Sequence, residues 1–327
     1  MLPPPGRVTV FTPYLGSWFF VQKTIKDLGQ TIDISKCRIA RTTRKVVVFG
    51  GKLANQFPLP HRGQFMAVLP IRHRAIDQIC TTPEVYEDWK DFGMYQDLLT
   101  FEEDLCAFVD VILLFLDGVG ACGECGAFIK DERTAKKLLV VMDEQYFEED
   151  SFVRLGLLFR LEHSHQNITL CVPRQLSNDD VGQIVYELEQ KLASAPLSEA
   201  LDLTNTRHQL FVIADFVELI QVARRSDIAS FLQELGVTLS AKRLSQLLYV
   251  LERFEIIKAS RGLREQLYAP LPTGEHYVNY SLAAGGRWDR ARVKALLFEK
   301  TREDKHRHQA FMRARQAEIG VQDVAQV

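Results

Sequence analysis

Two carboxylates and four glycines share one short stretch of the sequence, residues 117–128. An apolar run at 109–116 precedes it and predicts a strand, and the segment from Gly123 predicts a helix. Glycine lets the backbone approach a ligand closely, and the amino terminus of a helix offers N–H groups to an anion. We therefore predict that Glu124 is a catalytic carboxylate facing a bound ligand. The glycines predicted to contact that ligand are Gly118, Gly120 and Gly123.

The same stretch has two alternative interpretations. Glu124 could be an acid near a helix start that only stabilises the helix dipole, by about 0.3–1 kcal/mol. Cys122 and Cys125 also have the spacing of a metal or redox pair, but no second Cys or His pair stands at a spacing that would complete a zinc site. We therefore predict no metal and no cofactor.

Short apolar runs alternate with helix-like stretches over the first two thirds of the chain. The expected strands lie at 45–49, 84–86, 109–116, 138–142 and 168–172, and the expected helices at 64–79, 100–108, from 123 and at 181–192. This rhythm predicts an α/β fold with an open, doubly wound, mostly parallel five-stranded sheet, in which ligands bind beyond the carboxyl ends of the strands. Asp110 interrupts an apolar strand, where a carboxylate needs hydrogen-bond donors. It is assigned to substrate binding, and a structural role is the alternative.

The pattern changes to helices after Pro196. A strongly apolar helix at 209–223 precedes a short one that runs through Leu235 and is stopped by Gly236, and Ser240 is expected to cap a third at 241–254. Two short strands around a turn follow, so we predict a C-terminal winged helix-turn-helix domain. Basic side chains near the third helix and in the wing are typical of nucleic-acid contact, although such domains also bind proteins. The residues assigned to this contact are Lys242, Arg243, Gln246, Arg261 and Arg264.

These changes divide the chain into four parts. Residues 1–44 form an N-terminal extension, 45–195 a catalytic domain, 205–282 the winged helix domain and 283–327 a charged helical tail. The net charge is −2, but basic residues collect towards the C-terminus. No apolar run is long enough to span a bilayer, and the N-terminus has no export signal. The expected location is therefore the cytoplasm, with no membrane partner and with reduced thiols.

Several of these motifs resemble the nucleoside deoxyribosyltransferase family. The matching residues are Asp110, the sequence Leu-Asp-Gly at 116–118 and Glu-Cys-Gly-Ala at 124–127. The resemblance implies that Glu124 attacks C1′ of a sugar and that Asp117 contacts the sugar or transfers a proton. It also implies that Gly50 and Gly51, after the first strand, form the loop for the phosphate or the base.

Such a carboxylate forms a covalent glycosyl ester that water or a base then resolves. An ordinary nucleobase needs a proton as it leaves, whereas the nicotinamide of NAD is already cationic and departs neutral. Because only one convincing catalytic carboxylate is visible in the sequence, we expect NAD or a related nucleotide as the substrate.

The order of the two predicted domains is similar to that of the effector proteins of bacterial retrons. That resemblance implies an antiphage toxin, held inactive by a reverse transcriptase and its multicopy single-stranded DNA with attached RNA, in a higher-order assembly. Two alternatives remain. One is a nucleoside deoxyribosyltransferase or hydrolase of nucleotide salvage, and the other is a non-catalytic, nucleotide-sensing DNA-binding regulator.

Overall fold

The computed structural model describes residues 14–40, 44–51, 58–89, 93–148, 150–261, 266–271, 276–302 and 304–312. The chain forms two compact units. The second unit comprises residues 41–199 and 205–207, and the first comprises residues 1–40, 200–204 and 208–327. Each unit is therefore assembled from stretches of chain that are separated in sequence.

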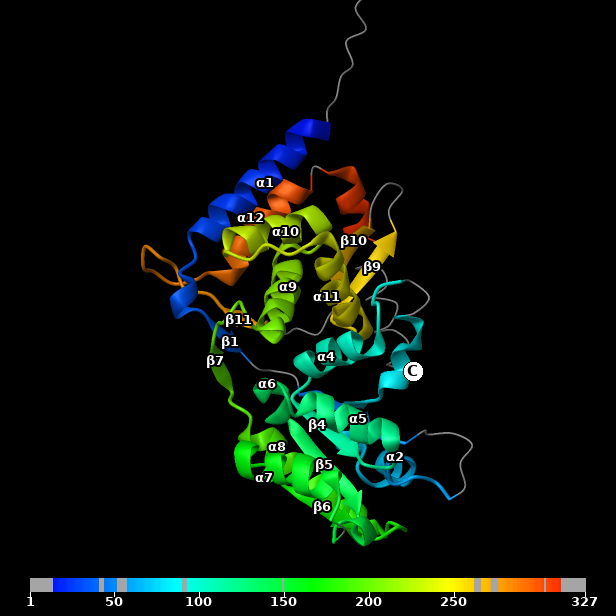
Figure 1. Cartoon of the computed structure of the whole chain (residues 1–327). Helices are drawn as coiled ribbons and strands as arrows, with labels where there is room; N and C mark the ends of the chain where they lie inside the picture. Colours follow the sequence, from blue (N-terminus) through cyan, green and yellow to red (C-terminus); the bar gives the residue numbers. More distant parts are fainter. Residues whose placement is uncertain are drawn as a thin grey trace, which may run out of the picture. The chain divides into compact units, whose positions relative to one another are not determined.

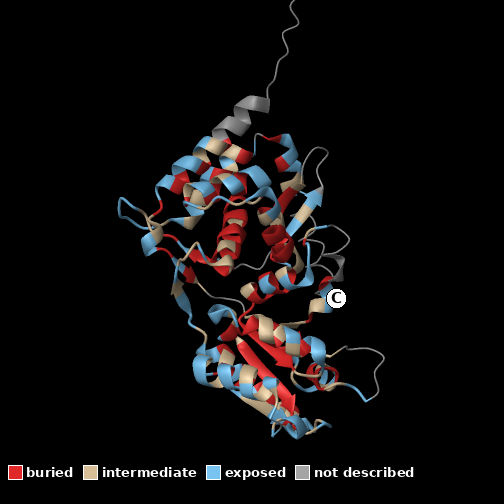
Figure 2. Cartoon of the chain, in the orientation of Figure 1, coloured by how far each residue is buried: buried red, intermediate tan, exposed pale blue. Residues whose placement is uncertain are grey.

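The second unit is built on a parallel five-stranded sheet with strand order β3-β2-β4-β5-β6, of which β4, β5 and β6 are labelled in Figure 1. The strands are β2 (Val46–Phe49), β3 (Cys80–Thr81), β4 (Val111–Phe115), β5 (Leu138–Asp143) and β6 (Thr169–Val172). Every residue of β2, β4 and β5 is buried (Figure 2). The continuous apolar runs are therefore the signature of strands covered on both faces. The predicted α/β fold with a parallel five-stranded sheet is confirmed.

Helices cover both faces of this sheet. On one face, α2 (His61–Arg72), α3 (Arg74–Asp77) and α8 (Asn178–Ser194) pack on alternate strand residues such as Val48 and Leu113. On the other face, Phe128 of α5 (Val119–Phe128) meets Phe49 with ring centroids 5.1 Å apart. The other helices of the unit are α4 (Leu98–Phe108), α6 (Glu132–Ala135), the π-helical η4 (Phe152–Leu158) and α7 (Phe159–His165).

One predicted strand was wrong. Residues 84–86 belong to the 3-10 segment η2 (Pro83–Trp89), and the edge strand is Cys80–Thr81 instead. Pro83 accounts for the difference, because its ring fixes φ and removes a backbone donor, which suits the start of a helical turn better than a strand interior. The helix predicted at 64–79 also begins earlier, at His61, and ends at Arg72 before the short helix α3.

Helix α5 begins at Val119, four residues before the predicted start at Gly123. Its first backbone hydrogen bond runs from Cys122 N to Gly118 O, at 3.1 Å. Glu124 is consequently the sixth residue of the helix rather than an acid beside its amino terminus. The interpretation of Glu124 as a dipole-stabilising acid of the first turn is therefore wrong, because the field of the helix end falls off within that turn.

The first unit contains helices and two small sheets. Helices α9 (Thr206–Ile220), α10 (Arg225–Glu234) and α11 (Ala241–Arg253) accompany an antiparallel sheet of order β8-β10-β9 (Ala223–Arg224, Gln266–Pro270 and Ile257–Arg261). Ser240 caps α11 and accepts a hydrogen bond from Arg243 N, as predicted. Strand β1 (Arg38–Ala40) pairs with β11 (Val278–Asn279), and β7 (Ser198–Ala200) lies where the chain passes between units.

Two helices from the ends of the chain complete the first unit. Helix α1 (Tyr14–Gln30) packs on α10, and Gln22 Nε2 donates to Asp227 Oδ1 at 2.7 Å. Helix α12 (Arg290–Thr301) also packs on α1. In the described ranges, no helix has the length and apolarity that crossing a membrane requires.

Candidate active site

The strand order places one crevice at the carboxyl edge of the sheet. The chain leaves β2 towards β3 on one side, whereas β4 lies on the other side of β2. Connections that depart in opposite directions leave a gap between neighbouring strands, and open α/β sheets bind their ligands there. Gly50 and Gly51 follow β2, and Asp117 and Gly118 follow β4. The structure therefore brings the two predicted loops together.

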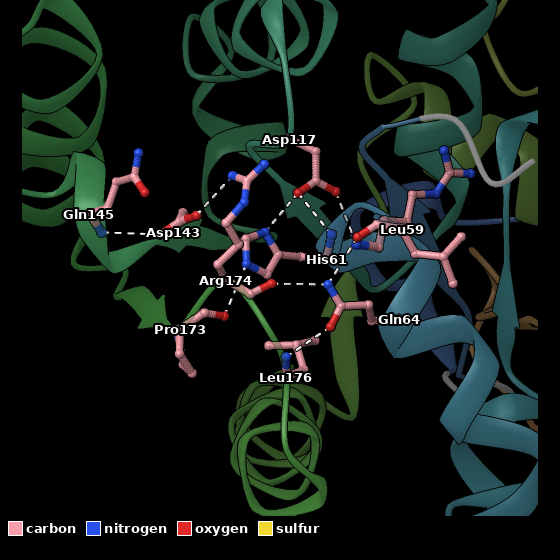
Figure 3. A network of polar contacts seen from close by, with 10 residues as sticks. Leu59, His61, Gln64, Asp117, Asp143, Gln145, Pro173, Arg174 and Leu176 are labelled. Atoms are coloured by element: carbon pink, nitrogen blue, oxygen red, sulfur yellow. Dashed lines mark hydrogen bonds and ion pairs between the residues drawn. The ribbon is translucent and has the colours of Figure 1, made fainter. Parts of the chain in front are cut away.

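Asp117 closes the amino terminus of helix α2 (Figure 3). Its Oδ1 accepts hydrogen bonds from His61 N at 3.1 Å and His61 Nδ1 at 2.9 Å, and its Oδ2 accepts one from Arg62 N at 3.0 Å. Burial disfavours the charged carboxylate, but the hydrogen bonds from His61 and Arg62 outweigh it and lower the pKa of Asp117. An ionised carboxylate with both oxygens engaged positions α2 and has no proton to give at neutral pH.

His61 joins the ends of two strands. Its Nε2 lies 3.1 Å from Pro173 O, after β6, while its Nδ1 contacts Asp117, after β4. Gln64 extends the same network to Arg174 O and Leu176 N, and Figure 3 shows these contacts together. Two oxygen acceptors call for two N–H donors, so this geometry favours the imidazolium form of His61.

We expect His61→Gln to destabilise the protein more at pH 6 than at pH 9. Burial favours the neutral ring of His61, but the hydrogen bond and charge of Asp117 outweigh it and raise the pKa of the histidine. Stability from such a group is present below its unfolded pKa of about 6.5 and is lost as pH rises through the folded value. Urea unfolding should show a loss of about 1–3 kcal/mol at pH 6. His163→Gln, at an exposed histidine, is the control, and equal losses at both pH values would refute the imidazolium.

The two glycines after β2 are required by packing. Gly50 has φ +145°, and a Cβ there would lie 2.9 Å from Phe115 Cβ and 3.1 Å from Arg62 Cβ. A Cβ on Gly51 would lie 3.0 Å from Asp117 Cβ. These close approaches hold the end of β2 against the end of β4 and against α2. Gly50 and Gly51 therefore shape the crevice, and contact with a substrate remains a prediction.

Gly50→Ala is expected to lower the free energy of unfolding by about 1–3 kcal/mol, because a side chain at this φ is strained and crowded. Gly118→Ala is the matched control. Its φ of 173° is extended, and no described heavy atom lies within 4 Å of the Cβ that would be added. Urea denaturation of both variants checks the expectation, which equal losses would contradict.

The three glycines predicted to contact the ligand share a different environment. A Cβ on Gly118, Gly120 or Gly123 would have no described heavy atom within 4 Å. The backbone at the start of α5 is therefore open, with room for a ligand to approach it. This is the accessibility that the prediction requires.

A buried arginine and a glutamate border the crevice. Arg62, which is 1% exposed, donates through Nη1 to Gly50 O at 3.2 Å and to Glu84 Oε1 at 2.8 Å. Its Nη2 forms a second, short bond with Glu84 Oε2. Burial disfavours the charged Glu84, but the arginine outweighs it and lowers the pKa of the glutamate. Arg62 is thus committed to the protein and contributes a fixed positive charge.

Among the predicted site residues whose side chains the structure describes, Glu124 is half-buried and has an unpartnered oxygen. Its Oε2 is buried and has no hydrogen-bond partner among the described residues. Burial raises the pKa of Glu124 to about 7, with the charge of Arg62 opposing the rise and that of Glu84 adding to it. A carboxyl group with a raised pKa and one buried oxygen that lacks a donor is a candidate for reaction with a ligand.

A second acid, Glu102 of α4, interacts electrostatically with Glu124 and Glu84. It is 5% exposed, and burial, with the charges of Glu124 and Glu84, raises its pKa to about 8. No role was predicted for it from the sequence. The signal was available, because Glu102 lies three residues before Leu105, a buried residue on the inner face of the helix. A carboxylate on the core-facing side of a helix is costly to bury, so this position marks a candidate functional residue.

Asp110 lies apart from Glu124 and Glu102. It precedes β4, at the amino edge of the sheet, whereas Asp117 follows the same strand at the carboxyl edge. Its carboxylate accepts hydrogen bonds from Arg207 Nη2 at 2.8 Å and from Lys45 N at 3.0 Å. These contacts assign Asp110 a structural role, which was the alternative interpretation of its place in an apolar strand.

The residues predicted to contact nucleic acid differ in how exposed they are. Lys242 is exposed and Arg243 half-buried on α11, but Gln246 is 7% exposed and faces the interior. Its assignment to a nucleic-acid surface was wrong, since it lies near the buried Leu247 and Leu248 rather than on the outer side of the helix. Arg261 belongs to β9, its side chain lies outside the described residues, and so does the whole of Arg264.

No group of three or more His, Cys, Asp or Glu in the described ranges could hold a metal ion. Cys122 is a free, half-buried thiol, and Cys125 is free and buried. Burial raises the pKa of both thiols, that of Cys125 to about 12. The CxxC spacing therefore holds two protonated thiols beside Glu124.

Comparison with known proteins connects this chain to retrons. Two Escherichia coli proteins are similar to it. "Retron Ec86 putative ribosyltransferase/DNA-binding protein" is 30% identical over 115 residues, covering 34% of this chain and 36% of that protein. "Retron Ec73 putative ribosyltransferase/DNA-binding protein" is 23% identical over 207 residues, covering 58% of this chain and 64% of that protein. The matched segments thus span less than two thirds of either relative.

A family model gives the wider match. The model of the STM3845 retron effector protein matches residues 59–259, which is more than half of the chain. The matched range contains Asp117, Glu124 and Glu102, together with helices α9 to α11. The predicted relation to retron effectors is confirmed, and this chain belongs to the STM3845 retron effector protein family.

Proposed function

We propose that this retron effector cleaves the N-glycosidic bond of NAD or a related nucleotide, with Glu124 as the nucleophile. The observation that carries the proposal is the buried, unpartnered Oε2 of Glu124 beside the crevice at the carboxyl edge of the sheet. The fold of this unit, as we propose, is that of the nucleoside deoxyribosyltransferases. The names of the two E. coli relatives include "ribosyltransferase", which supports this chemistry.

In the proposed reaction, a Glu124 oxygen attacks C1′ of the sugar. A C–O bond forms as the C1′–N bond breaks, and the electron pair of that bond leaves with the base. Water or another acceptor then attacks C1′ of the glycosyl ester and releases the Glu124 carboxylate. We assign the role of nucleophile to Glu124, whose Oε2 has no partner among the described residues, and burial raises the pKa of both Glu124 and Glu102.

Glu102 favours a second candidate activity, a nucleoside deoxyribosyltransferase or hydrolase. An ordinary base leaves as a poor anion unless an acid protonates it, whereas the nicotinamide of NAD leaves neutral without a proton. In this reaction a protonated Glu102, which interacts with Glu124, supplies the acid. The site therefore has the parts for both substrate classes, and activity measurements must separate them.

The first unit is proposed to hold a winged helix domain that touches nucleic acid. Helices α9 to α11 with the sheet β8-β10-β9 have the element order of that fold, and Lys242 is exposed near the start of α11. The names of both E. coli relatives also include "DNA-binding". We propose that a reverse transcriptase and its multicopy single-stranded DNA with attached RNA hold the effector inactive in a higher-order assembly. Release during phage infection would then stop cell growth.

The test is release of free base by the purified full chain, with and without the co-expressed reverse transcriptase and its DNA. Chromatography should detect nicotinamide from NAD, or the free base from a panel of deoxynucleosides and nucleotides. Growth arrest on expression, relieved by Glu124→Gln, should accompany the activity. If no base is released under any condition and Glu124→Gln leaves the phenotype unchanged, the chain is a nucleotide-sensing regulator and the enzymatic proposal is wrong.

A further inference from the structure

The carboxyl end of helix α4 is held by two cationic side chains from outside the helix. Lys137 Nζ donates to Cys106 O at 3.0 Å and to Ala107 O at 2.8 Å. Arg207 Nη1 donates to Phe108 O at 2.7 Å and forms a short bond with Val109 O. The last carbonyls of a helix have no partner within it, so these side chains complete the end of α4.

Arg207 is fixed on its other side by a carboxylate. It is 4% exposed, and its Nη2 donates to Asp110 Oδ1 at 2.8 Å. Asp110 Oδ2 in turn accepts from Lys45 N at 3.0 Å, just before β2. A planar guanidinium with donors on two sides holds the helix end and the strand start in one geometry, which a point charge such as lysine cannot reproduce.

Arg207 also occupies a special place in the chain. It is the second residue of helix α9, and its backbone N donates to Asn205 Oδ1 at 3.0 Å. Residues 205–207 belong to the second unit, and from His208 onward the same helix belongs to the first unit. The residue that completes α4 is therefore the last one before the chain enters the other unit.

We propose that Arg207 is a positioning residue for Glu102, through which a displacement of helix α9 reaches the acid of the active site. Glu102 lies six residues before Phe108, about 9 Å along the axis of α4. Withdrawing the guanidinium would leave Asp110 and two helix carbonyls short of donors in a buried place, a large penalty that α4 can relieve only by shifting or fraying. The inference rests on the proposed function and adds a route for its regulation.

The test compares Arg207→Gln and Arg207→Lys with Arg44→Gln in the full chain. Arg44 is a matched control, because its Nη1 lies 3.7 Å from the same Asp110 oxygen and the described contacts of α4 do not include it. We expect hydrogen exchange of the amides at 102–108 to become at least about tenfold faster in Arg207→Gln, a partial effect in Arg207→Lys, and no change in Arg44→Gln.

Activity provides a second measurement. Displacing Glu102 from its buried place should move the alkaline limb of deoxynucleoside cleavage to lower pH in both Arg207 variants, a shift that a general loss of folded protein would not produce. Should Arg207→Gln fail to fold, Arg207→Lys and Asp110→Asn carry the test. Unchanged exchange at 102–108 in the folded variants overturns the inference. Because exchange needs no substrate, this outcome is distinct from failure of the proposed enzymatic function.

Discussion

Replacing Glu124 by Gln is expected to lower cleavage of the N-glycosidic bond at least about 1,000-fold, which corresponds to about 4 kcal/mol of transition-state stabilisation. The amide has the shape of the carboxyl group but cannot form the glycosyl ester. Steady-state assays with the substrate that the wild type cleaves measure the effect. Mass spectrometry of the wild type under turnover should detect a sugar attached to Glu124, and the variant should carry none.

The pH dependence of the wild type provides an independent check on Glu124. The nucleophile must be ionised, and burial raises the pKa of Glu124 to about 7. Activity is therefore expected to rise as pH increases through about 7 rather than through the ordinary glutamate range near 4.3. An acid limb near pH 4 would show that the reacting carboxylate is not in this environment.

Unfolding would not explain such a loss of activity. A carboxyl whose folded pKa is raised stabilises the fold below its unfolded pKa, and this contribution disappears as pH rises through the folded value. At pH 8 the buried Glu124 is therefore a cost to the fold, and the neutral amide should leave thermal stability unchanged or higher. A variant that melts at lower temperature at this pH would instead indicate a structural role for the ionised carboxylate.

The strands and the loop that position Glu124 could be predicted from the sequence. Unbroken apolar runs at 46–49 and 111–115 are buried strands, and short runs of this kind that alternate with helix-like stretches are typical of a sheet covered on both faces. The rule that ligands bind at the carboxyl edge then selected the loop after β4. These inferences depend on local pattern and on general topology, both of which a single sequence contains.

What the sequence did not predict depends on long-range contacts. Asp117 is committed to the amino terminus of α2, 55 and 56 positions away along the chain, and Asp110 to Arg207, 97 positions away. No local pattern reveals such partners, so a carboxylate that completes the fold looks the same as one that faces a ligand. The start of α5 was misplaced for a related reason, because glycines usually argue against a helix, and here Gly118 is the N-cap and Gly120 lies in the first turn.

Glu102 gives the second large effect. Glu102→Gln should lower cleavage of deoxynucleosides by about 10²–10⁴-fold, the usual contribution of a general acid, while cleavage of NAD changes by less than about tenfold. The difference follows from the leaving groups, because an ordinary base must take a proton from Glu102 and nicotinamide need not. Parallel assays of both substrates measure it. Glu103→Gln, at the exposed neighbour on the same helix, is the matched control and should leave both activities unchanged.

The wild-type pH profiles should differ in the same way. Glu102 must be protonated to act as an acid, and burial, with the charges of Glu124 and Glu84, raises its pKa to about 8. Deoxynucleoside cleavage should therefore fall as pH rises through about 8, whereas NAD cleavage should keep its plateau. Equal losses for both substrates in Glu102→Gln would mean that the residue only shapes the site.

Burial of Glu102 should lower the stability of the fold at high pH. A glutamic acid whose folded pKa is raised contributes most below its unfolded value and progressively opposes folding as pH rises towards about 8. Glu102→Gln should therefore melt at a higher temperature than the wild type at pH 9, while losing activity on deoxynucleosides. If Glu102→Gln is more stable but less active, the destabilising carboxyl group is needed for proton transfer. If the variant is more stable and equally active, Glu102 has no role in the reaction.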